Sequence, residues 1–165
     1  MPYPPWYKHS KKLINPHGLT KTFLSPNGSI VLKRAPHLHA DPGRFETIVR
    51  AWERASELGV TPTLLRSERS KRSTFFEYEF VKGVDLYEWW SLHSRDRGRT
   101  ESVRRAARTI LTKLHRAGIV FGDVNAGNFI VDEHDRVWIV DWDTVSMVDD
   151  DLIHLNMMFE RLGVQ

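Results

Sequence analysis

Asp123, Asn128 and Asp141 are residues of types, and at a spacing, that could perform chemistry. They lie in the stretch FGDVNAGNFIVDEHDRVWIVDWD, residues 121–143, where the runs NFIV and RVWIV flank the turn DEHD. This pattern predicts a hairpin, whose two ends converge in space although they are distant in sequence. Amide and carboxylate oxygens are hard ligands that suit Mg²⁺. Asp123 stands in the preceding loop, where an uncommitted carboxylate could accept a proton from an attacking hydroxyl.

Each of these residues alone also has a structural interpretation, because Asp and Asn often shape turns and an Asp can cap a loop. The combination is more specific. A catalytic-loop Asp, an Asn at the fifth position after it, and a second Asp that follows a hairpin match a template for phosphoryl transfer. Asp123 is therefore the candidate proton acceptor, and Asn128 and Asp141 are the candidate Mg²⁺ ligands.

Strands and one helix are predicted upstream of this stretch. An Asn-Gly pair separates two apolar runs in TKTFLSPNGSIVLKRA, residues 20–35, which is a strong hairpin signal. From residue 41 to 58, apolar residues recur at helical spacing and end at Gly59, a natural C-cap. STFFEYEFV, residues 73–81, is rich in aromatic and β-branched residues and is predicted to be a strand.

The elements predicted after Gly83, which we interpret as a joint between two lobes, are mainly helical. A long helix is indicated by the apolar stripe Val103, Ala107, Ile110, Leu111 and Leu114. The run VDDDLIHLNMMFERLG, residues 148–163, predicts a short final helix. Trp89 and Trp90 in YEWW favour packing in the core or at the lobe joint over a stacking platform for a sugar.

The segment LHRAGIVFGDVNAGNFIVDEHDRVWIVDWD resembles the catalytic segment of the protein-kinase-like superfamily. It looks most like the small atypical kinases of lipopolysaccharide core heptose, and it is similar to RIO-type kinases and aminoglycoside phosphotransferases. The resemblance covers roughly residues 19 to 160. It implies an α+β, minimal two-lobed protein-kinase-like fold with a truncated C-terminal lobe. The N-terminal lobe, residues 1–82, would hold antiparallel strands and one helix, and the C-terminal lobe, residues 83–165, the catalytic loop and the metal-binding hairpin.

The resemblance also implies roles for residues upstream, together with ATP and Mg²⁺ as cofactors. Lys33 in IVLKRA looks like the strand lysine that contacts the nucleotide phosphates, and it joins Asp123 as a candidate catalytic residue. The following helix would supply its acidic partner, either Glu53, which is the better placed, or Glu46. YEFVKG resembles the inter-lobe hinge, so the backbone groups of Glu79 and Val81 would meet the adenine.

The sequence departs from the family pattern at several positions. Phe121 stands where many of these kinases have His, and we interpret it as a packing residue. Asp143 replaces the Gly of the usual Asp-Phe-Gly, so it could bind metal or face solvent. NPHG around Gly18 is the only candidate for a glycine-rich phosphate loop. One Asp of the run 149–151 would support the catalytic loop, and the pattern leaves open which one. Because 22 residues follow Asp143, a peptide-binding groove of the ordinary kind is not expected.

Composition narrows the class of protein. The chain has 165 residues, 41% of them hydrophobic, which is enough for one core divided between two small lobes. It has no cysteine, which excludes a disulfide scaffold, and its eight histidines show no paired metal-ligand spacing. We expect a cytoplasmic protein without a signal peptide or transmembrane segment. The net charge of +3 leaves peripheral membrane contact open, while nucleic acid is not an expected partner.

The sequence thus predicts an ATP-dependent phosphotransferase that moves the γ-phosphate to a hydroxyl. The expected acceptor is a sugar or cell-envelope glycan such as lipopolysaccharide, or another small molecule. One alternative is an atypical Ser/Thr protein kinase of RIO type that works with a protein partner. Another is a pseudokinase that acts as a binding or regulatory module. The weak glycine loop and the short C-terminal lobe favour this alternative. Retention of Lys33, Asp123, Asn128 and Asp141 together favours catalysis.

Overall fold

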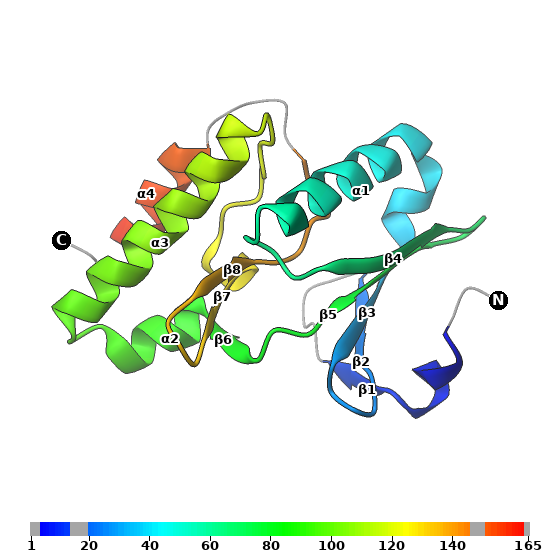
Figure 1. The fold of residues 1–165 in the computed structure, drawn as a ribbon, viewed down its shortest axis with the longest axis horizontal. Helices are drawn as coiled ribbons and strands as arrows, with labels where there is room; N and C mark the ends of the chain where they lie inside the picture. Colours follow the sequence, from blue (N-terminus) through cyan, green and yellow to red (C-terminus); the bar gives the residue numbers. More distant parts are fainter. Residues whose placement is uncertain (1–3, 14–19, 146–150, 164–165) are drawn as a thin grey trace. The chain divides into compact units, whose positions relative to one another are not determined.

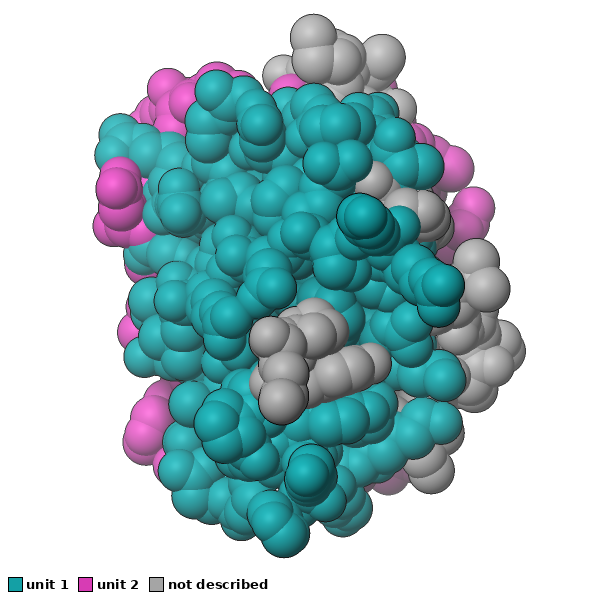
Figure 2. Space-filling view, turned by 90° about the vertical axis from the view of Figure 1, so that its right-hand side faces the viewer, with its two compact units in different colours: residues 1–56, 62–80 teal, residues 57–61, 81–165 magenta. Residues whose placement is uncertain are grey.

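The computed structural model describes residues 4–13, 20–145 and 151–163. In these ranges the chain forms four α-helices and eight strands in two sheets, and the predicted α+β class is confirmed (Figure 1). The chain divides into two compact units. Unit 1 comprises residues 1–56 and 62–80, and unit 2 comprises residues 57–61 and 81–165. Figure 2 colours the two units separately and shows mostly the surface of unit 1.

Unit 1 is built on a five-stranded antiparallel sheet with the spatial order β1-β2-β3-β5-β4. Its strands are β1 (Lys11–Leu13), β2 (Lys21–Leu24), β3 (Ile30–Ala35), β4 (Leu64–Arg69) and β5 (Thr74–Glu79). The hairpin predicted over residues 20–35 is confirmed as β2 and β3. At its turn, Gly28 has a φ of +71°, and Asn27 Oδ1 accepts hydrogen bonds from the side chains of Ser25 and Ser29. A left-handed conformation of this kind is adopted readily by glycine.

Different aromatic side chains cover the two faces of this sheet. On one face, helix α1 (Pro42–Glu57) packs Trp52 against Phe76 and Tyr78 of β5, with ring centroids 5.6 and 5.0 Å apart. On the other face, the 3₁₀ helix η1 (Pro5–His9) brings Tyr7 edge-on to Phe23 at 4.8 Å. A second 3₁₀ helix, η2 (Pro36–Ala40), links β3 to α1. The period of two along each strand assigns alternate residues to these two cores.

Unit 2 combines a three-stranded sheet with three helices. The sheet has the order β6-β7-β8, formed by β6 (Gly83–Asp85), β7 (Phe129–Asp132) and β8 (Val137–Ile139). The helices are α2 (Leu86–His93), α3 (Arg97–Arg116) and α4 (Asp151–Arg161). The predicted apolar stripe of α3 is buried along its length, and Gly118 follows the helix with a φ of +74°.

Two elements of unit 2 were not predicted, namely β6 and α2. The side chain of Asp85 caps α2 by accepting a hydrogen bond from Glu88 N at 2.9 Å. The helix buries Trp89 and Trp90, which are 2% and 6% exposed, so their interpretation as packing residues is confirmed. Two buried indoles at adjacent helical positions leave no flat surface for a sugar.

Residues 57–61 interrupt unit 1 and belong to unit 2, where they extend the edge of β8. Ile139 N donates to Val60 O at 3.0 Å, and Thr61 Oγ1 donates to Ile139 O at 2.7 Å. Trp142 Nε1 donates in turn to Thr61 Oγ1 at 2.9 Å. Thr61 is 2% exposed, so its hydroxyl is a buried junction between two segments that are distant in sequence.

Candidate functional site

Asp123 lies in the loop between α3 and β7, and two amide side chains hold its carboxylate. Asn128 Nδ2 donates to Asp123 Oδ2 at 2.9 Å and to Asp123 O at 3.0 Å. Asn125 Nδ2 donates to the other carboxylate oxygen, Oδ1, at 2.9 Å. Asp123 itself is exposed, whereas Asn128 is 7% exposed. The loop therefore presents an oriented carboxylate to solvent and keeps one of its supporting amides buried.

Asn128 and Asp141 lie at the same end of the β7–β8 hairpin. Asn128 ends the 3₁₀ helix η3 (Ala126–Asn128), and its carbonyl accepts a hydrogen bond from Val140 N at 2.9 Å. Phe129 and Ile139, the next residues inward, pair directly in the sheet. Asp141 follows Val140 with a φ of +67°, a left-handed conformation that Asp adopts more readily than most side chains. The backbone therefore turns sharply at the point where the hairpin brings the two candidate ligands into one region.

The chemistry of these side chains fits a magnesium ion that keeps most of its own ligands. In the described ranges, no group of three or more His, Asp or Glu residues forms a metal site. Both hydrogen bonds of the Asn128 side chain are donated by Nδ2, and no group among the described residues donates to its Oδ1. One amide oxygen and one carboxylate are few ligands for a resident cation, but Mg²⁺ normally retains waters and substrate phosphates.

Helix α4 anchors the loop through Asp151. This carboxylate is fully buried and accepts hydrogen bonds from Phe121 N at 2.7 Å and Gly122 N at 2.8 Å. His115 Nε2 of α3 lies 3.0 Å from its Oδ2. Of the three aspartates at 149–151, Asp151 therefore supports the loop, and the other two lie outside the described residues.

Phe121 fills the core beneath the loop. It is fully buried and meets Trp142 edge-on, with ring centroids 5.1 Å apart. A histidine at this position would bring a polar ring into an apolar contact, and the protein uses Asp151 and His115 for the polar support instead. The packing interpretation of Phe121 is thus consistent with its surroundings. Asp143, one residue beyond Trp142, is half-buried.

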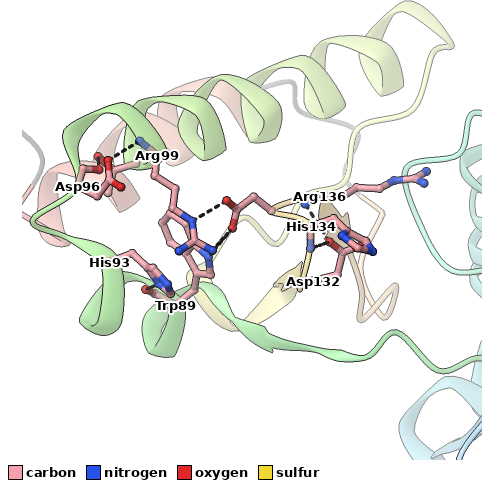
Figure 3. A network of polar contacts seen from close by, with 9 residues as sticks. Trp89, His93, Asp96, Arg99, Asp132, His134 and Arg136 are labelled. Atoms are coloured by element: carbon pink, nitrogen blue, oxygen red, sulfur yellow. Dashed lines mark hydrogen bonds and ion pairs between the residues drawn. The ribbon is translucent and has the colours of Figure 1, made fainter.

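A polar network fixes the turn between β7 and β8 (Figure 3). Asp135 in this turn has a φ of +59°, and its carboxylate accepts two hydrogen bonds from Arg99, at 2.6 and 2.7 Å. Trp89 Nε1 donates to the same carboxylate at 3.2 Å. The Arg99 hydrogen bonds, helped by Trp89, hold the pKa of Asp135 below its usual range despite partial burial. Two helices thereby clamp the hairpin that carries Asn128 and Asp141.

Asp132, at the other end of this turn, organises it from within. Its Oδ1 accepts from the backbone N–H groups of His134 and Arg136, and its Oδ2 accepts from Trp138 Nε1 at 3.0 Å. Burial alone would raise the pKa of Asp132, but these hydrogen bonds outweigh it and lower that pKa. The side chain of Arg136 lies 3.9 Å above the Trp138 ring and donates to Gly59 O at 2.9 Å.

In unit 1, Lys33 is a buried residue of β3, with 2% exposure. It pairs directly with Phe76, so the two side chains share the face of the sheet that α1 covers. Glu53 of α1 is exposed, and Glu46 is exposed and lies 4.0 Å from Arg50.

Glu79 ends β5, and its backbone N–H is already used, since it donates to Thr63 O at 3.1 Å. Only the carbonyl of Glu79 could therefore serve as a new contact for a base. Val81 is the first residue after the chain leaves unit 1. Gly18, the candidate for the phosphate loop, lies outside the described residues.

A small cavity of about 100 Å³ opens beside the candidate catalytic loop. It is lined by Tyr87, Val124, Asn125, His154, Met157, Met158 and Arg161, which come from α2, the loop and α4. Tyr87 and Met157 are 58% and 42% exposed, respectively. The cavity lies entirely within unit 2.

Sequence reasoning missed Asn125 as a partner of Asp123. An Asn two residues after an Asp is a signal for a local side-chain hydrogen bond, so the contact was readable in principle. Asp151 could only be narrowed to three neighbouring aspartates, because its contacts with Phe121 and Gly122 span 30 and 29 residues.

Comparison with known proteins agrees with this geometry. Residues 53–159, well over half of the chain, match the profile of the ABC1 atypical kinase-like domain. A search of curated proteins gave no significant match. No helix among the described residues combines the length and hydrophobicity needed to cross a membrane. The matched range holds α2, α3, the loop with Asp123, the β7–β8 hairpin and nearly all of α4. The chain therefore belongs to the family of ABC1 atypical kinase-like domains.

Proposed function

We propose that this protein is a phosphotransferase that moves the γ-phosphate of ATP to a hydroxyl group. The observation that carries the proposal is the loop geometry: an exposed Asp123 carboxylate, held by Asn128, at the end of the hairpin that also carries Asp141. Membership in a kinase-like family supports the same reaction class. A turn-forming role alone would not require an exposed carboxylate with both of its oxygens held by amides.

Asp123 is the proposed proton acceptor. The acceptor hydroxyl gives its proton to this carboxylate as its oxygen forms a bond to the γ-phosphorus, and the bond from that phosphorus to the β–γ bridging oxygen breaks, so that ADP leaves. Phosphoryl transfer needs little covalent help from the protein, and catalysis depends mainly on position and charge neutralisation. The anchoring of Phe121 N and Gly122 N by Asp151 supplies the fixed position.

Asn128 and Asp141 are the residues that would hold Mg²⁺. When bound, the ion would neutralise the negative charge of the nucleotide phosphates. Asn128 would contribute its Oδ1, since its Nδ2 is bonded to Asp123, and Asp141 would contribute its carboxylate. A second carboxylate, that of the half-buried Asp143, lies two residues beyond Asp141 and could also bind the ion.

Unit 1 would supply the nucleotide contacts. Lys33 is the proposed phosphate ligand, because a lysine held in a sheet with 2% exposure is placed more precisely than a surface lysine. Glu53 is the proposed acidic partner, with Glu46 as its rival. The Glu79 carbonyl and the Val81 backbone are the proposed contacts of the adenine. Cytoplasmic location is part of this proposal, since ATP is available there.

The proposed acceptor is a small hydroxyl-bearing molecule, with a sugar of a cell-envelope glycan as the first class to test. A cavity of about 100 Å³ beside Asn125 has room for one such group but not for an extended peptide. The likeness of the catalytic stretch to sugar and aminoglycoside kinases points the same way.

The experiment is a thermal-shift titration with ATP, with and without Mg²⁺, on wild type and on two variants of Asp141. A ligand that binds the native state at about 100 times its Kd adds about 2.7 kcal/mol to the stability. We expect a Mg²⁺-dependent rise in Tm that both Asp141→Ala and Asp141→Gly lose. Two variants are needed because Asp141 has a left-handed backbone, which glycine tolerates and alanine does not.

Turnover is then measured as ADP formation with a panel of sugars and peptides. Asp123→Asn should bind Mg²⁺-ATP like wild type but lose ADP formation by about 10²–10⁴-fold, the usual contribution of a general base. Unchanged ADP formation by Asp123→Asn would contradict the role of this residue. Nucleotide binding without any turnover by the wild type would instead identify a pseudokinase.

A further inference from the structure

In the sequence, Asn125 lies between the candidate base Asp123 and the candidate metal ligand Asn128, and its part in the reaction is not covered by the proposed function. Its Nδ2 donates to Asp123 Oδ1 at 2.9 Å, and its Oδ1 accepts from Gly127 N at 3.0 Å. We propose that Asn125 is a positioning residue for phosphotransfer, whose amide orients the Asp123 carboxylate toward the proton that it accepts. The inference rests on the proposed function and extends it by one residue.

The first argument is the freedom of the carboxylate without Asn125. The terminal torsion of an Asp side chain is broad, so an exposed carboxylate rotates unless both oxygens are held. Asn128 holds only Oδ2, at 2.9 Å, and Asn125 holds Oδ1 at the same distance. One donor on each oxygen fixes the plane of the group. Each oxygen keeps further lone-pair capacity, so the clamp leaves room to accept a proton.

The second argument is that the orientation of the Asn125 amide is determined by its neighbours. Gly127 N–H can only donate, so the Asn125 atom that faces it must be the oxygen. The nitrogen then necessarily faces Asp123. Asn125 is itself fixed, because it is the N-cap of η3 and its carbonyl accepts from Asn128 N at 3.1 Å.

The third argument separates the two uses of this side chain. Ser and Asp cap a helical turn about as well as Asn does. Neither would reproduce the second contact: an aspartate has no N–H to give to Asp123, and the short serine side chain does not extend as far as the Asn125 amide. A residue that only capped η3 could be exchanged for serine without loss. Aspartate would in addition set a second carboxylate against Asp123, so Asn125→Ser is the variant that distinguishes the two roles.

In the reaction, Asn125 exchanges no proton. The proton of the acceptor hydroxyl moves to Asp123, the acceptor oxygen bonds to the γ-phosphorus, and ADP takes the electrons of the broken bond. Asn125 acts through Asp123 by keeping one carboxylate oxygen on the line of the departing proton. Misplacement of a reacting group by about 1 Å can lower a rate by about 100-fold, which sets the size of the expected effect.

The test measures kcat and KM for ADP formation, together with Tm, for Asn125→Asp and Asn125→Ser. We expect kcat to fall about 10–100-fold in both, since the base is misoriented. KM for ATP should stay within about twofold in both variants, and Tm within about 2 °C in Asn125→Ser, because serine keeps the cap. Asn125→Asp should have a lower Tm than Asn125→Ser, because its carboxylate repels that of Asp123. Asn156→Asp is the matched control. Asn156 lies on α4, and its Oδ1 accepts a hydrogen bond from Arg108 of α3 at 2.7 Å. The kcat of this variant should equal that of wild type.

A wild-type kcat in Asn125→Asp and Asn125→Ser would overturn the positioning role. With Asn125→Ala measured as a third variant, a kcat that falls only in Asn125→Ala and in proportion to its lower Tm would also overturn this role, because that pattern describes a cap and nothing more. The proposal requires that kcat reaches the wild-type value only when Asn is present at position 125.

A readout independent of turnover keeps this inference separate from the proposed function. In ¹⁵N-labelled protein, the Asn125 Nδ2 proton that faces Asp123 should be shifted downfield by its charge-assisted hydrogen bond and should lose that shift in Asp123→Ala. If the wild type forms no ADP, phosphotransfer is refuted, but the chemical shift of the Asn125 Nδ2 proton still tests the contact with Asp123. An Asn125 amide that does not respond to Asp123→Ala would refute the clamp, whether or not ADP is formed.

Discussion

Single side chains in this protein are held by unusually complete sets of partners where the candidate chemistry is placed. Asp123 has one amide donor on each oxygen, and Asp151 has two backbone donors and a histidine. The spacing of Asp123 and Asn128 predicted one loop, and the two residues are indeed in direct contact. Their roles remain predictions. The contact of Asn125 with Asp123 was not predicted, because the motif is defined by Asp123 and Asn128 and does not specify the residues between them.

Asp135 should make the stability of the protein depend on acid. Its pKa is lowered in the folded state, mainly by the Arg99 hydrogen bonds. The stabilisation is therefore fully present above the ordinary pKa of an Asp and is lost as the pH falls through the lowered value. Asp135→Asn should lower Tm at pH 7 by about 2–4 °C and flatten the loss of stability below about pH 4. Thermal unfolding measured between pH 7 and pH 3 checks this.

Glu133→Gln in the same turn is the control for that measurement. Glu133 is exposed and lies 3.5 Å from Lys82, a pair that is screened by solvent and should contribute little. Asparagine tolerates the left-handed backbone of Asp135, so Asp135→Asn isolates the charge. If both variants follow the same pH dependence as wild type, Asp135 is not the group responsible.

Helices and strands with local signals were predicted, and those without them were not. The Asn-Gly turn of β2–β3 and the apolar stripe of α3 are complete within a few residues of sequence. Helix α2 is only eight residues long and aromatic in its centre, so it shows too little helical period to be recognised. Asp85 with Glu88 three residues later was a capping signal that could have located its start. Strand β6 has three residues and depends on its partner β7.

Gly83 and Gly98 should respond in opposite directions to alanine. A Cβ at Gly83 would overlap with Val131 O and lie 2.8 Å from an Ile130 side-chain carbon, so β6 would have to leave β7. At Gly98, in the first turn of α3, the nearest atom would be a side-chain oxygen of Asp96 at an ordinary 3.6 Å. We expect Gly83→Ala to destabilise by at least about 1–3 kcal/mol and Gly98→Ala to stabilise by about 0.5–1 kcal/mol.

Urea unfolding of these two variants, with a common m-value, measures the difference. The comparison is matched because both changes add one methyl group to unit 2. Equal effects of the two substitutions would mean that the close contact of β6 with the Val131 carbonyl is not maintained in solution.

The chain as a unit depends on one short segment that no local pattern reveals. Residues 57–61 leave unit 1, complete the edge of β8 in unit 2 and return. The sequence predicts only a helix cap at Gly59 in this segment. The contact of Thr61 with Ile139 was not predicted, because the two residues are separated by 78 positions. The predicted division of the sequence at residue 82 has a single boundary, so it makes no provision for residues 57–61, which lie before that boundary and belong to unit 2.

Thr61→Val should therefore destabilise the whole protein strongly for so small a change. The replacement is nearly isosteric, but it removes the buried donor to Ile139 O and the buried acceptor of Trp142 Nε1. Two buried groups without partners amount to roughly 2–5 kcal/mol. Chemical denaturation measures this loss, with Thr109→Val, an exposed position on α3, as the control. A change below 1 kcal/mol, as expected of a surface site, would show that water replaces the hydroxyl.

The detour of residues 57–61 also sets an order of events during synthesis. On the ribosome, Thr61 is made 78 positions before Ile139, the residue to which it binds. At about 5–20 residues per second, Thr61 waits roughly 4–16 s for its partner. During that interval Val60 and Thr61, each 2% exposed in the finished protein, have no sheet edge to join. The nascent chain therefore passes through a stage at which a chaperone could bind a segment that the mature protein never displays.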